Sequence, residues 1–210
     1  MADQVEPSFI RRWLAPSGGL EAFAPTPAVI CGGCGLGVGR TASLVREPGS
    51  GTALCPICRL GRDPATPPGA LVLAWLPEFA QGELNRLYTT LTLDLLRARQ
   101  AGREAGAGIH WRGELLDGLY ARAWSTQRHL PWTQHLSLLR DTLLALPDSE
   151  RAFALPVLAG LRYLPNPRHP PLGVFFRRLM SWLQPNGADR DDVSNHQPGV
   201  LHDDAIHDQL

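Results

Sequence analysis

Cys31-Gly-Gly-Cys34 and Cys55-Pro-Ile-Cys58 are the two stretches that decide the fold of this chain. They contain all four cysteines of the protein, and 20 residues separate the two pairs. A CxxC turn can place both of its sulfur atoms on one metal ion, and two such pairs complete a tetrahedral shell of four sulfurs. The spacing therefore predicts a structural Zn2+ site whose ligands are Cys31, Cys34, Cys55 and Cys58.

Other uses of these thiols fit the pattern less well. Two disulfides would need an oxidising compartment, and the acidic stretch Met1–Pro7 lacks the features of a signal peptide. A thioredoxin-like redox site would have a single CxxC within a βαβ unit. Four protein ligands leave no open position for water or substrate, so the pattern favours a structural ion over a catalytic one.

The length and charge of the chain argue against two classes, membrane-spanning proteins and strongly basic nucleic-acid binders. Its 210 residues suffice for one domain, or for a small module and a larger one, and no apolar run is long enough to span a bilayer. All 20 basic residues are arginines, and the net charge is zero. Residues 189–210 carry six aspartates and one arginine, so the remainder is only mildly basic. We therefore expect a cytoplasmic protein without the strong basic surface of a nucleic-acid binder.

Composition and hydrophobic spacing predict an α+β protein with four segments. These are an N-terminal arm at 1–27, a four-cysteine zinc module at 28–69, a mainly helical body with one strand at 70–184, and an acidic disordered tail at 185–210. The arm contains a short amphipathic helix near residues 9–14, which either packs on the body or binds a partner.

The module is expected to contain strands at 28–30, 40–46 and 52–54, the last two forming a hairpin between the cysteine pairs. A short helix is expected from Cys58. Gly32, Gly33 and Gly35 suit the first cysteine turn, because glycine accepts positive φ angles. This order of elements resembles a treble clef.

The body is expected to begin with a buried strand at 70–75. Leucine spacing then predicts helices at 80–103, 110–128, 132–146, 149–161 and 172–184. Asp148 is expected to cap the fourth of these helices, and Pro156 to kink or shorten it. The proline-rich stretch at 163–171 is expected to be an extended connector.

No catalytic residues are predicted. None of the seven histidines lies between the cysteine pairs, and His110, His129 and His135 stand near expected helix ends. No serine has the context of a nucleophile elbow. The glycines at 35–39 follow a cysteine turn rather than a buried strand, so they do not form a dinucleotide-binding loop.

Two stretches together resemble one known family. The first is Leu73-Ala-Trp-Leu-Pro-Glu-Phe-Ala-Gln-Gly-Glu-Leu-Asn-Arg-Leu-Tyr88, and the second is Leu161-Arg-Tyr-Leu-Pro165 with Phe176-Arg-Arg-Leu-Met-Ser-Trp-Leu183. Behind a double CxxC module, they are similar to the DotN (IcmJ) proteins of type IVB secretion systems over residues 28–184. The LPExxQxELN stretch is the most specific part of the resemblance.

The resemblance implies a zinc-stabilised module related to the HNH nuclease fold, with appended helices and no catalysis. It also implies an adaptor that binds the C-terminal tail of the DotL-like coupling ATPase, with other coupling-complex subunits, on the cytoplasmic side of the inner membrane. A related conjugation system is an equally open context. The resemblance carries only Cys31, Cys34, Cys55 and Cys58 onto this chain and leaves the partner-binding residues unknown.

The alternative from a different class is a nucleic-acid-binding or HNH-derived nuclease-like protein. Cleavage would need a histidine base and a metal held by histidine or carboxylate, and the only acid between the cysteine pairs is Glu47. A binder would need arginines 40, 46, 59 and 62 on one face. An adaptor would instead expose apolar area on the helices at 80–103 or 110–128.

Overall fold

The computed structural model describes residues 21–23, 29–38, 44–46, 50–63, 66–67, 69–102, 107–130, 136–166 and 170–182. The expected helix near residues 9–14 and the expected tail from residue 185 lie outside these ranges. Within them the chain is a mixed α+β protein, which confirms the predicted class.

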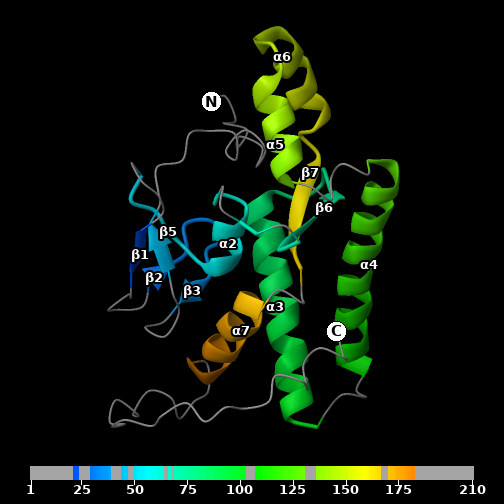
Figure 1. The fold of residues 1–210 in the computed structure, drawn as a ribbon. Helices are drawn as coiled ribbons and strands as arrows, with labels where there is room; N and C mark the ends of the chain where they lie inside the picture. The colour runs from blue at the N-terminus through cyan, green and yellow to red at the C-terminus, as the bar shows by residue number, and fades with distance from the viewer. Residues whose placement is uncertain are drawn as a thin grey trace, which may run out of the picture.

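The cysteine module is built from short antiparallel strands and one short helix, and its first strand lies at 21–23, within the segment that is predicted to be the N-terminal arm (Figure 1). Strands β1 (Glu21–Phe23), β4 (Leu44–Arg46) and β5 (Ala53–Leu54) form one sheet, and β2 (Val29–Ile30) pairs with β3 (Gly37–Val38). The β4–β5 hairpin between the cysteine pairs confirms its prediction. Helix α2 (Pro56–Leu60) begins at Pro56 rather than at Cys58, because the fixed φ of proline suits the first helical position.

The body contains two strands, so the prediction of a single one is wrong. Strand β6 (Leu71–Trp75) pairs antiparallel with β7 (Leu161–Pro165), and Leu73 lies opposite Tyr163. The sequence assigned 161–165 to a helix end and a connector, because prolines surround it. Pro165 is tolerated since it stands at the end of the strand, where one missing donor costs little.

Five helices complete the described body. They are α3 (Gln81–Gln100), α4 (Ala107–His129), α5 (Leu136–Ala145), α6 (Asp148–Val157) and α7 (Pro170–Trp182). Each coincides with an expected helix within a few residues at either end, except that α6 stops at Val157, just after Pro156. Asp148 is the first residue of α6 and not its cap, which is Pro147.

The β6–β7 ribbon separates two apolar clusters. Leu71 and Leu73 join the larger cluster, which includes the four cysteines, Tyr163 and the apolar side of α7. Ala74 and Leu164 join a smaller cluster with Leu119 and Ala123 of α4. Because side chains alternate along a strand, one ribbon packs against the cysteine module on one face and against α4 on the other.

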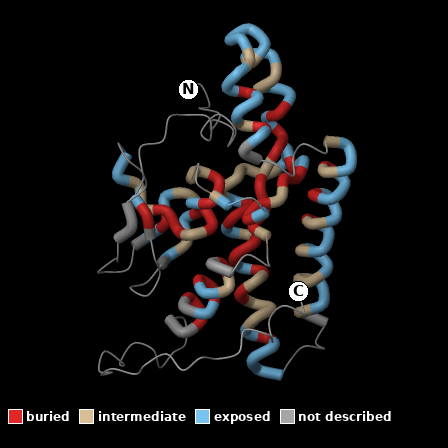
Figure 2. The backbone as a smooth tube through the Cα atoms, viewed as in Figure 1, coloured by how far each residue is buried: buried red, intermediate tan, exposed pale blue. Residues whose placement is uncertain are grey.

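Helices α5 and α6 form a hairpin that projects from the body (Figure 1). Arg151 of α6 binds carbonyl oxygens at the end of α5. Its Nε donates to Leu143 O at 2.9 Å, and its Nη2 donates to Leu144 O at 3.0 Å and to Leu146 O at 2.7 Å. No residue of α6 is buried, and the tip of the hairpin is largely exposed (Figure 2). The base of the hairpin nevertheless joins the larger core cluster through the buried Leu139, Leu143 and Leu158, whereas its tip is exposed.

Candidate metal centre

The four cysteine sulfurs come together in one buried cluster. Their Sγ atoms all lie within 4.8 Å of one another, and the Sγ atoms of Cys34 and Cys55 are 3.9 Å apart. No pair is joined as a disulfide. A tetrahedral ion with metal–sulfur bonds of about 2.3 Å requires sulfurs about 3.8 Å apart. The cluster thus has the composition and dimensions of a metal site, as the cysteine spacing predicts.

The backbone of the first cysteine turn lies close to these sulfurs, and backbone N–H groups donate hydrogen bonds to one of them. Gly33 N donates to Cys31 Sγ at 3.4 Å, and Cys55 N donates to the same sulfur at 3.2 Å. Of the glycines expected at positive φ, Gly35 alone has such an angle, at 71°. Gly33 is needed for space instead, because a Cβ there would stand 2.8 Å from Cys58 Sγ.

The four thiols differ in how readily they ionise. Hydrogen bonding with Cys34 lowers the pKa of Cys31, whereas hydrogen bonding with Cys31, together with burial, raises the pKa of Cys55. Neighbouring buried thiolates repel, so the first one to ionise makes the next harder to ionise. A divalent cation removes this conflict by binding the thiolates directly, and it releases their protons as it binds.

The first turn of α3 lies directly against the cysteine turn. Gly82 approaches it so closely that a Cβ at this position would stand 2.3 Å from Gly33 O. Arg86 Nη2 donates to Gly35 O at 3.2 Å. The helical body therefore contacts the backbone that carries Cys31 and Cys34, and this contact depends on the absence of a side chain at residue 82.

We expect Gly82→Ala to lower the melting temperature of the metal-loaded protein, because the added methyl group must push α3 away from Gly33 O. Overpacking of this kind costs about 1–3 kcal/mol. Gly118→Ala is the matched control, since a Cβ there meets nothing within 4 Å and alanine favours a helix by up to about 1 kcal/mol. Differential scanning calorimetry of both variants checks the contact. A Gly82→Ala protein as stable as Gly118→Ala would contradict it.

A buried polar network extends from the cluster into the body. Asn85 Nδ2 donates to Cys58 Sγ at 3.2 Å and to Tyr163 Oη at 2.8 Å. Tyr163 Oη in turn donates to Ile57 O at 3.2 Å. Burial holds the pKa of Tyr163 well above its usual range, so the phenol keeps the proton that it donates. The network therefore ties α2, α3 and β7 together beside the sulfurs.

Gln81 anchors this network to the edge of β7. Its Oε1 accepts from Tyr163 N at 3.0 Å, and its Nε2 donates to Tyr163 O at 3.0 Å and to Asn85 Oδ1 at 2.9 Å. The side-chain amide thus takes the place that a further strand would occupy. The sequence alone indicates no role for Gln81 or Asn85, although their spacing of four residues places both on one face of α3.

The other polar residues of the Leu76–Asn85 stretch also make contacts. Glu78 forms an ion pair with Arg122 of α4, and hydrogen bonds from Arg122 lower the pKa of Glu78. Glu83 Oε2 accepts from Ala80 N at 3.1 Å, which satisfies a donor at the start of α3. The stretch that carries the family resemblance thus contacts three parts of the structure: the module, β7 and α4.

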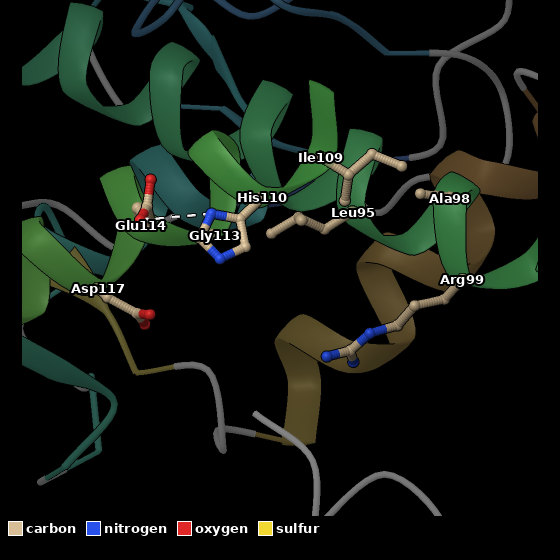
Figure 3. A pocket seen from close by; sticks show the side chains of 8 residues that line it. All are labelled: Leu95, Ala98, Arg99, Ile109, His110, Gly113, Glu114 and Asp117. Atoms are coloured by element: carbon tan, nitrogen blue, oxygen red, sulfur yellow. Dashed lines mark ion pairs between the residues drawn. The ribbon is translucent and has the colours of Figure 1, made fainter. Parts of the chain in front are cut away.

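A shallow cavity of about 280 Å3 lies between the end of α3 and the start of α4 (Figure 3). Its polar wall includes His110, whose Nδ1 lies 3.3 Å from Glu114 Oε1, and both side chains are mostly exposed. The volume is below that of typical ligand pockets, about 300–1,000 Å3, and the solvated pair resembles a helix-surface contact. His129 is also exposed, and His135 lies outside the described residues.

The arginines near the module bear on the nucleic-acid alternative. Arg46 and Arg59 are exposed, and Arg62 is half-buried; Arg40 lies outside the described residues. The guanidinium of Arg59 binds Asp63, with its Nη2 2.8 Å from Asp63 Oδ2. One of the four required charges is therefore already neutralised by a neighbouring carboxylate.

None of the helices in the described part of the chain combines the length and the apolar character that a membrane span needs. Comparisons of the chain with protein-family models, with curated proteins and with solved structures found no match. Four buried, unpaired cysteines within metal-binding distance, on a mixed α+β scaffold, are therefore what identifies the candidate site.

Proposed function

We propose that the four cysteines bind a structural zinc ion. Four sulfur ligands in a tetrahedral arrangement suit Zn2+, and a closed shell gives the ion no position at which to activate water. The order of cysteine turn, β4–β5 hairpin and α2 supports a treble-clef module of the HNH-like kind. When bound, the ion supplies folding energy rather than chemistry.

We further propose that the protein is a non-catalytic adaptor of a type IVB secretion or related conjugation system. In this role it binds the C-terminal tail of a DotL-like coupling ATPase on the cytoplasmic side, peripheral to the inner membrane. The observation that carries the proposal is the amount of apolar surface that the helices expose. Trp124 on α4 is 59% exposed, and Phe153 and Val157 on α6 are 79% and 58% exposed.

The α6 surface is the stronger candidate for the tail. Phe153 and Val157 are four residues apart, so they lie on one face of a helix that buries none of its own residues. Asp141, Asp148 and Glu150 are exposed on the same hairpin. An apolar face beside carboxylates suits an amphipathic helix with basic residues, which would lay its apolar stripe against α6.

The nucleic-acid alternative receives less support from the same surfaces. The Arg59–Asp63 pair compensates one of the charges that it requires. Asp141 and Glu150, which are exposed on the α5–α6 hairpin, would also repel a phosphate backbone, whereas Asp148 pairs with Arg151. The adaptor role therefore explains the exposed helices better.

We expect Phe153→Asp combined with Val157→Asp to reduce binding of the ATPase tail at least about tenfold, because both changes place charge in an apolar contact. The measurement is a titration of the immobilised C-terminal tail of a type IVB coupling ATPase with the full-length, metal-loaded protein. Ala152→Asp is the matched control, since it adds a charge to an exposed α6 position beside that face. Failure of the wild-type protein to bind would reject the adaptor role. Equal binding by the double variant would reject the α6 surface.

A further inference from the structure

Asn85 is a side chain of the helical body that donates a hydrogen bond to a cysteine sulfur of the module. It is 2% exposed and lies in the second turn of α3. The donors to Cys31 Sγ are backbone N–H groups of the module itself. Cys58 Sγ instead accepts a hydrogen bond from a side chain of the helical body.

The direction of this hydrogen bond is fixed by the backbone of β7. Tyr163 N can only donate, so the atom of Gln81 that faces it must be the carbonyl Oε1. The other atom of that amide is then Nε2, which donates to Tyr163 O and to Asn85 Oδ1. Asn85 consequently presents Nδ2, with its two hydrogens, to Cys58 Sγ and Tyr163 Oη. If the side-chain amide of Gln81 were rotated by 180°, its Nε2 would face the donor Tyr163 N. If that of Asn85 were rotated, its Nδ2 would face the donor Gln81 Nε2.

A donor in this position suits a metal-bound thiolate. Four thiolates around a divalent cation leave a net charge of −2 in a buried site, which is costly unless hydrogen-bond donors offset it. Hydrogen bonds to a charged acceptor are about twice as strong as neutral ones. Donors around the ligands also fix their orientation, and removing one such partner typically weakens metal affinity about 10–100-fold.

We propose that Asn85 is a positioning residue of the metal centre, which orients and stabilises the Cys58 thiolate from α3. Gln81 holds Asn85 in the donating orientation by binding both backbone groups of Tyr163. Metal affinity is therefore set partly by the docking of α3 and β7 on the module. This inference rests on the proposed zinc site and is independent of the adaptor role.

The test compares Asn85→Leu with the wild-type full-length protein, because leucine keeps the approximate shape of asparagine and lacks the donor. Two quantities are measured: Zn2+ affinity by competition with a chromophoric chelator, and the sulfur-to-metal charge-transfer absorption of the Co2+-substituted protein. We expect the affinity to fall about 10–100-fold and the absorption band to shift. Gln81→Leu should have a smaller effect in the same direction, because Asn85 then keeps its sulfur contact but loses its orienting partner.

Thr126→Val is the matched control for a purely structural loss. Thr126 Oγ1 accepts from Trp75 N at 2.8 Å and donates to Arg122 O at 2.9 Å, so its removal should destabilise the fold without touching a sulfur. It should leave the absorption band unchanged. Where Asn85→Leu fails to fold, Asn85→Ser retains a short donor and should lie between it and the wild type.

Each outcome decides the proposal. Wild-type protein that binds neither Zn2+ nor Co2+ would overturn the metal site and the role of Asn85 together. Wild-type protein that binds metal, with Asn85→Leu equal to it in affinity and spectrum, would overturn the role of Asn85 alone. A shift of the band in Asn85→Leu, absent in Thr126→Val, would support it.

Discussion

Replacement of Cys34 by serine is expected to remove most of the folded population at physiological temperature. The Cys34 and Cys55 sulfurs lie 3.9 Å apart in the buried cluster, so replacement of Cys34 leaves the four-sulfur shell one ligand short. Structural zinc contributes about 10–16 kcal/mol in small metal-dependent modules. Loss of even about 4 kcal/mol would lower the melting temperature by roughly 8–16 °C in a chain of this size.

The measurement is a thermal melt of Cys34→Ser beside metal analysis of the purified, untagged protein. Ile30→Ser is the matched control, because it makes a similar change four residues away at a side chain that is 70% exposed. Incubation of the wild type with a strong chelator should reproduce the low melting temperature of Cys34→Ser. Equal melting temperatures and metal contents for both variants and the wild type would show that the cysteines do not hold a structural ion.

Tyr163→Ala is expected to give the second largest loss of stability. The ring is 2% exposed and lies so close to α2 that a Cβ at Gly61 would stand 2.0 Å from Tyr163 Cε1. Truncation of a buried aromatic ring typically costs about 3–5 kcal/mol. Here the truncation also removes the packing of β7 against Gly61 of the module. It leaves Asn85 Nδ2 without one of its two acceptors.

Two further variants separate these contributions. Phe153→Ala removes a comparable ring from an exposed position, so it should change the melting temperature little. Tyr163→Phe removes the hydroxyl alone and should cost about 1–3 kcal/mol, because Asn85 Nδ2 and Ile57 O lose their partner. Chemical denaturation at saturating Zn2+ gives all three free energies of unfolding. A Tyr163→Ala protein as stable as Phe153→Ala would show that the Tyr163 ring does not hold the module against β7.

The sequence predicts those parts of this fold that depend on local spacing. The two CxxC pairs indicate the sulfur cluster because their geometry is set within a few residues of each turn. Apolar residues at helical spacing indicate α3 because Leu84, Tyr88 and Leu91 fall on one face of the helix, and all three are buried. In α4 the same rule fails toward the ends. The same spacing places Trp111 and Leu115 on one face with the buried Leu119 and Ala123, but Trp111 and Leu115 are exposed.

Strand β7 and the role of Asn85 depend on residues far apart in the sequence. Leu161–Pro165 lies among prolines, and its pairing with β6 becomes visible only when the two segments are placed side by side. Asn85 has ordinary properties for a helical residue until Cys58 and Tyr163 are placed beside it. Helix propensity gives no sign of such a contact, because it describes the backbone and not the partner of a side chain.

The pairing of β6 with β7 has a consequence for the order in which the nascent chain can mature. Cys58 is synthesised 105 residues before Tyr163. At translation rates of about 5–20 residues per second, this delay lasts roughly 5–20 s. During that time the thiols have left, or are leaving, the ribosome without the tyrosine that later covers them. If the cysteines bind an ion as proposed, its uptake can thus precede the packing of Tyr163 beside Cys58, and α7 emerges later still.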